Sequence, residues 1–252
     1  MESSKISIKH LVIAIIVMTI FFYAGYGYIK DNSRENTIPT REEVLEMYPM
    51  FEAIKKIDPE KFESLYKEIK AMPYTDDKDV KNKYILKVLA SINVWFDSKI
   101  GNLLNSASDE AVNKYGNHFI NSIDVLLKND PTGVQCFNTV YPGMIGDLDV
   151  FKLEDDIKGM AKKAVYLNAI ADSIARGDKI DRLPVEQVEE AFSIINDKLV
   201  IKYGEDYYVE DPKELAKQPS LICRKTLDLL REVLALDPHL SAEILRYIRA
   251  PE

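Results

Sequence analysis

An uncharged, strongly apolar stretch near the start of the chain constrains this protein more than any other feature. Residues 11–29 read LVIAIIVMTIFFYAGYGYI and contain no charged side chain. A helix of this length spans about 28 Å, close to the thickness of one hydrocarbon core. The alternatives are a buried core helix and a cleaved signal peptide. Such a long apolar run at the extreme N-terminus favours a membrane segment over a core helix.

The C-terminal edge of this stretch favours an anchor that is not cleaved. Signal peptidase needs small residues three positions and one position before the cut. Cleavage after Ala24 would place Phe22 at the first of these positions, and cleavage after Gly27 would leave too long an apolar region. Tyrosines near this edge also resemble the aromatic belt of a membrane interface. We therefore expect residues 11–29 to be a transmembrane signal anchor.

The basic residues that flank the anchor are nearly balanced between its two sides. A short tail with two lysines, residues 1–10, is typical of an N-terminus that stays in the cytoplasm while the following chain is exported. Residues 30–40 are polar and form a tether, and residues 41–252 are long enough to bury a core as one soluble domain. We expect a single-pass protein of the inner (cytoplasmic) membrane with a periplasmic domain.

Apolar residues between positions 41 and 252 recur at helical spacing, and strand signals are nearly absent. The most regular run is Val185, Val188, Phe192, Ile195 and Leu199. Helix starts with Asp before Pro occur four times, at Asp58, Asp130, Asp211 and Asp237. Their unequal spacing argues against a true repeat. The pattern predicts an all-α domain of seven to nine helices, with the alanine-rich residues 153–175 as a candidate central helix.

The chain contains only two cysteines, Cys136 and Cys223. Two cysteines exclude a disulfide framework, but they leave open either a single bridge or two buried free thiols. In an oxidising compartment, one bridge closing so long a loop would contribute roughly 4 to 5 kcal/mol in the chain-entropy model.

Neither the histidines nor the cysteines have the spacing of a metal site. The chain has three histidines, His10, His118 and His239, which form no pair at ligand spacing. A cysteine nucleophile would need a positioned histidine base, and no local signature supports one. A phosphate-binding glycine loop is also missing from the sequence. We therefore expect no catalytic residues, no metal and no cofactor.

Two other patterns resemble functional motifs only superficially. Ser64 and Lys67 match the serine-lysine spacing of penicillin-interacting enzymes, but the partner motifs of those enzymes are missing. Asp147 and Asp149, followed by acidic residues 154–156, lack the alternating oxygens of a calcium loop. Acidic residues that complement a helix dipole explain them better.

The net charge of −8 argues against nucleic acid as a partner and against docking on anionic lipid headgroups. The sequence predicts a non-enzymatic helical protein of the bacterial envelope that binds another protein. Its role would be that of a scaffold or assembly factor, or of an immunity-type inhibitor of a periplasmic toxin. The alternative is an envelope enzyme, such as a cell-wall hydrolase with a lone catalytic carboxylate. The expected partner surface comprises the loop 141–149 and the segment 205–211, represented by Tyr141, Asp147, Asp149, Tyr207 and Tyr208.

Overall fold

The computed structural model of this chain describes residues 39–47, 49–73, 75, 77–140, 145, 165–204, 207 and 211–249. The predicted anchor, residues 11–29, lies outside these ranges, as do the tail 1–10 and most of the tether 30–40. None of the helices within the described ranges combines the length and apolarity needed to cross a membrane.

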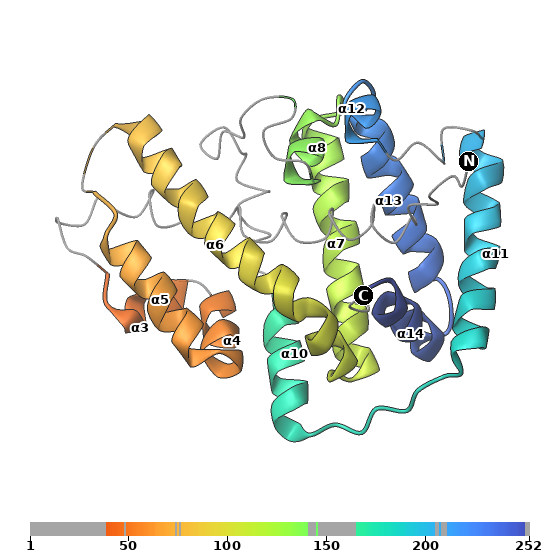
Figure 1. Ribbon diagram of the computed structural model, residues 1–252, viewed down its shortest axis with the longest axis horizontal. Helices are drawn as coiled ribbons and strands as arrows, with labels where there is room; N and C mark the ends of the chain where they lie inside the picture. Colours follow the sequence, from red (N-terminus) through yellow and green to blue (C-terminus); the bar gives the residue numbers. More distant parts are fainter. Residues whose placement is uncertain are drawn as a thin grey trace, which may run out of the picture.

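The secondary structure in the described ranges is helical, with no strand, which confirms the all-α part of the predicted fold class (Figure 1). The helices are α3 (Arg41–Met47), α4 (Pro49–Ile57), α5 (Pro59–Lys70), α6 (Lys78–Asn105), α7 (Asp109–Asn129), α8 (Val134–Val140), α10 (Val165–Arg176), α11 (Val185–Tyr203), α12 (Pro212–Leu215), α13 (Pro219–Leu234) and α14 (Pro238–Ile248). They already outnumber the seven to nine expected, because prolines and caps divide the chain into short helices.

Side-chain caps begin several of these helices. At the start of α3, the backbone N–H of Thr40 donates to Glu43, and the N–H of Glu43 donates to the Thr40 hydroxyl, which completes a capping box. Asp58 and Asp237 cap α5 and α14, each followed by Pro at the first helical position. Asp130 differs, because its carboxylate instead shapes a turn and α8 begins only at Val134.

Helix α7 lies at the centre of the larger part of the fold. It packs against α13 and α14, and also against α8 and α10 (Figure 1). Gly116 permits the close approach, since a Cβ there would lie 2.9 Å from Leu245 and 3.2 Å from Leu234. The central position predicted for residues 153–175 is therefore held by α7. Of that predicted helix, the described part begins at Val165 and packs between α4 and α7.

Helices α3, α4 and α5 pack together at the other end of the molecule, and α6 runs from them toward α7 (Figure 1). One carboxylate joins α5 to α6. The first oxygen of Asp58 caps α5, while its second accepts the indole N–H of Trp95 at 2.8 Å. These hydrogen bonds favour the charged carboxylate, and the bond from the backbone of Lys61 does most to lower the pKa of Asp58.

Candidate functional site

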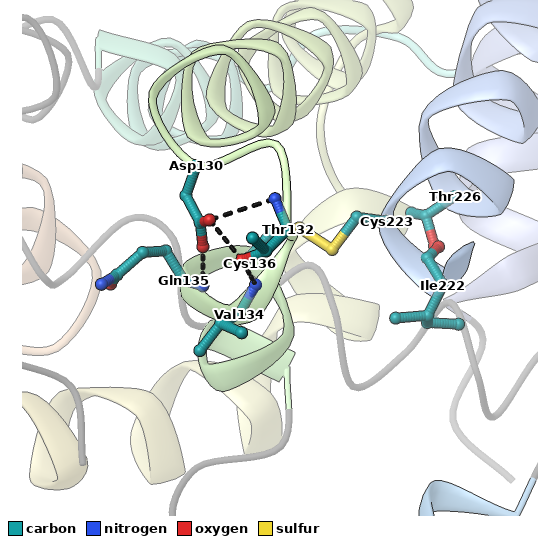
Figure 2. The surroundings of a disulfide bond; sticks show 8 residues. All are labelled: Asp130, Thr132, Val134, Gln135, Cys136, Ile222, Cys223 and Thr226. Carbon is teal, nitrogen blue, oxygen red and sulfur yellow. Dashed lines mark hydrogen bonds between the residues drawn. A yellow bond between two sulfur atoms is a disulfide. The ribbon is translucent and has the colours of Figure 1, made fainter. Parts of the chain in front are cut away.

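The structure joins Cys136 of α8 to Cys223 of α13, and their Cα atoms lie 6.3 Å apart (Figure 2). Both cysteines are fully buried. The bridge resolves the choice that the sequence left open in favour of a disulfide. It ties α8 to α13 across a sequence separation of 87 residues.

Local geometry brings the two cysteines together. The Asp130 carboxylate accepts hydrogen bonds from the backbone of Thr132 and Gln135, and the Thr132 hydroxyl also donates to it (Figure 2). The turn then passes through Gly133, whose φ of +77° lies in the left-handed region. A Cβ at Gly133 would lie 2.3 Å from the Cα of Ser220, at the start of α13. Glycine therefore lets α8 approach α13 closely enough for the bridge.

A buried ionic network forms a second polar centre, which the sequence reading missed. The Arg246 guanidinium is fully buried and donates to Asp109 at 2.7 Å and to Glu243 at 2.6 Å. It also donates to the backbone carbonyls of Leu104 and Ala107 at 3.0 and 2.7 Å. Arg246 therefore holds α14 against the junction of α6 and α7.

The outer members of this network reach the surface. Arg182 donates to the second oxygen of Glu243 at 2.9 Å, and His239 Nδ1 lies 2.6 Å from the second oxygen of Asp109. An Asp–His pair can orient a catalytic base, but no other side chain in the described ranges hydrogen-bonds to the His239 ring. Because each carboxylate oxygen of Asp109 and Glu243 already has a cationic or imidazole partner, we interpret the network as structural.

The burial of α14 in the structure explains why this network is needed. Every residue from Ser241 to Arg246 is buried, so α14 is enclosed around its whole circumference. A helix enclosed in this way must bury its charged residues too, and buried charges require partners. The identity of those partners depends on the packing of α14 against α7, which sequence periodicity does not reveal.

The partly buried His118 packs against aromatic rings of the core. Its ring lies 4.7 Å from the ring of Tyr166, centroid to centroid, and 5.7 Å from that of Phe119. Burial lowers the pKa of His118 to about 4, because the charged imidazolium would lose its hydration. The side chain is therefore neutral near pH 7. Among the described residues, no group of three or more His, Cys, Asp or Glu is placed to hold a metal ion.

Serine and lysine side chains do meet between α5 and α6, but in another pairing than Ser64 with Lys67. The Lys61 ammonium donates to the Ser91 hydroxyl at 2.8 Å, and that hydroxyl donates to Glu68 at 3.1 Å. The hydroxyl proton thus points to a carboxylate and away from lysine, which is the wrong direction for a lysine base. We interpret this chain of hydrogen bonds as a bridge between the two helices.

Of the five residues predicted to form the partner surface, the structure describes only Tyr207. Tyr141, Asp147, Asp149 and Tyr208 lie outside the described residues. Tyr207 is only 3% exposed, and its hydroxyl donates to Asn196 at 2.7 Å. Its placement on a contact surface is therefore wrong. The acidic sequence around Tyr207 suggested an exposed loop, whereas the large aromatic ring is held in the core.

Comparisons with protein-family models, with curated proteins and with solved structures find no match to this chain.

Proposed function

We propose that this protein is a membrane-anchored, non-enzymatic component of the bacterial envelope whose helical domain binds another protein outside the cytoplasm. Scaffolding of an assembly and inhibition of a periplasmic toxin are two forms of this role. The observation that carries the proposal is the buried disulfide between Cys136 and Cys223. Structural disulfides persist in oxidising compartments and are rare in the cytosol.

The sequence before the domain supports the same location. The apolar residues 11–29 would hold the chain in the inner membrane, and the polar residues 30–40 would separate the domain from the bilayer. A short lysine-bearing tail on the cytoplasmic side would leave the disulfide on the oxidising side. Two independent features, one in the N-terminal sequence and one in the tertiary structure, thus favour a periplasmic domain.

The internal construction of the domain suits recognition of a protein. The disulfide fixes α8 on α13, and the Arg246 network fixes α14 on the junction of α6 and α7. A frame held in this way has little conformational freedom left to lose when it binds a partner, and preorganisation of this kind favours affinity.

Location is tested with the full chain in intact cells whose outer membrane has been permeabilised. We expect added protease to digest the domain, and non-reducing electrophoresis to show the faster migration of a bridged chain. The variant Cys136→Ala should migrate like the reduced protein and serves as the reference. Protection from protease together with free thiols would place the domain in the cytoplasm and refute the proposal.

Binding is tested by chemical cross-linking of the full chain in the same cells, followed by identification of the linked peptides. We expect one partner of the envelope, or an imported toxin, to be captured at a fixed ratio. A chain that remains free under these conditions would contradict the binding role. Turnover of cell-wall glycan that one carboxylate substitution abolishes would contradict the non-enzymatic role.

A further inference from the structure

Exposed large hydrophobic side chains are concentrated on one helix. Within the described ranges these side chains are Val94, Val185, Ile194 and Ile201. Only Val94 lies outside α11. Ile194 is 54% exposed and Ile201 is 86% exposed. Single apolar residues on a surface are ordinary, but here two exposed isoleucines lie on the same helix.

The two isoleucines share one face of α11. They are seven residues apart, close to two helical turns. Glu190 lies four residues before Ile194, and Asp197 lies three residues after Ile194 and four residues before Ile201. This spacing places all four side chains in one stripe along the helix, with aliphatic and acidic residues in alternation. We call Glu190, Ile194, Asp197 and Ile201 the α11 outer face.

The opposite face of α11 is already used by the fold. Val188, Phe192, Ile195 and Leu199 are buried there, and the helix packs on α13 and α14. Figure 1 shows α11 at the edge of the molecule, beside α13. The outer face is therefore not needed to form the core.

Charge on the outer face is negative. The lysines of this helix, Lys198 and Lys202, turn toward α13 and pair with its Glu232 and Asp228. Glu190 and Asp197 are exposed and form no ion pair with any residue that the structure describes. An exposed stripe in which two aliphatic side chains alternate with two carboxylates is complementary to a helix with aliphatic side chains flanked by Lys or Arg.

We infer that the α11 outer face docks a basic amphipathic helix of the protein partner. This inference rests on the proposed function and adds to it the surface and the chemistry of the partner. A second copy of the chain fits less well, because two acidic faces brought together would repel. The same charge opposes docking on anionic lipid headgroups.

The experiment uses the full chain in nanodiscs of zwitterionic lipid, with empty nanodiscs as the reference. Two labelled synthetic helices of about three heptads serve as probes. Both carry leucine at the seam positions, and they differ only in having lysine or glutamate beside the seam. We expect the lysine probe to bind and the glutamate probe to remain free. Added salt should weaken binding.

Two double variants and one matched control test the surface itself. Ile194→Ser with Ile201→Ser should weaken binding of the lysine probe at least about tenfold, because the aliphatic contact is lost. Glu190→Lys with Asp197→Lys should transfer binding to the glutamate probe. Val94→Ser, which changes an equally exposed apolar residue on α6, should leave binding unchanged.

Several outcomes would overturn the inference: failure of the lysine probe to bind, unchanged binding by the serine variant, or an equal loss with Val94→Ser. A dimer of the wild-type chain that Ile201→Ser dissociates would assign the face to a second copy instead. Cellular cross-linking separates the two proposals. A partner captured equally by the wild type and the serine variant would refute this docking surface, while the proposed function would stand.

Discussion

Removal of the disulfide should lower the stability of this domain strongly. The bridge closes a loop of 87 residues. In the chain-entropy model, loss of a cross-link of that length costs about 4 to 5 kcal/mol of unfolding free energy. Cys136 and Cys223 are fully buried, so replacement by alanine leaves a small cavity at each position. Each cavity lowers the unfolding free energy by about 1 kcal/mol.

Equilibrium denaturation of the full chain in neutral detergent measures this loss. Helical circular dichroism and the fluorescence of Trp95, the only tryptophan, report unfolding. We expect the variant Cys136→Ala with Cys223→Ala to lose about 6 to 7 kcal/mol. A loss of this size corresponds to a fall in melting temperature of roughly 12 to 28 °C for a domain of this size.

The single variants supply the decisive control. Each single variant already lacks the bridge. When single and double variants are compared under reducing conditions, the second substitution should therefore add only the cost of its own cavity, about 1 kcal/mol. Reduced wild-type protein should show the cross-link loss without either cavity. If the two single losses add up to the double loss, or if reduction changes stability by less than about 1 kcal/mol, the reasoning is refuted.

Three further predictions concern other buried features. Arg246→Met should lower the unfolding free energy by about 3 to 5 kcal/mol, since it leaves two carboxylates of the network without their main partner. The control Arg176→Met, at an exposed ion pair, should lower it by less than about 1 kcal/mol. Equal losses would refute a special role for burial. Gly133→Ala should lower the unfolding free energy by about 3 kcal/mol or more, because positive φ and a backbone contact at 2.3 Å act together. Gly177 also has positive φ but faces open space, so Gly177→Ala should cost only about 1 to 2 kcal/mol. The difference between the two variants measures the effect of the backbone contact. His118 should make the domain acid-sensitive, because its folded pKa of about 4 lies below the ordinary value of 6.5. Between those values the unfolded chain binds the proton first, so stability falls as pH falls, by about 3 kcal/mol at pH 4 relative to pH 7. His118→Phe should remove that part of the pH dependence, and an unchanged pH profile would contradict the assignment.

Local sequence signals predicted much of the helical framework. The Asp–Pro starts at Asp58 and Asp237 form as expected, and a capping box of Thr40 and Glu43 begins α3. These features depend on neighbours within four residues, so the sequence itself contains both partners of each interaction. Gly204 likewise ends α11 with positive φ.

Features that depend on distant partners could not be predicted in this way. Tyr207 reads as exposed because its neighbours are acidic, yet its hydroxyl meets Asn196 and its ring is buried. Arg246 lies near the end of α14, and its guanidinium donates to backbone carbonyls more than 130 residues earlier in the chain.

By itself the sequence determined that the domain is helical, where many of its helices begin, and which face of each amphipathic helix turns inward, because backbone caps and apolar periodicity are local properties. Only the tertiary structure decided that Cys136 meets Cys223, that α7 occupies the centre, and that Arg246 is buried among carboxylates. Those outcomes depend on how helices pack. Packing brings together side chains whose separation along the chain carries no signal of their distance in space.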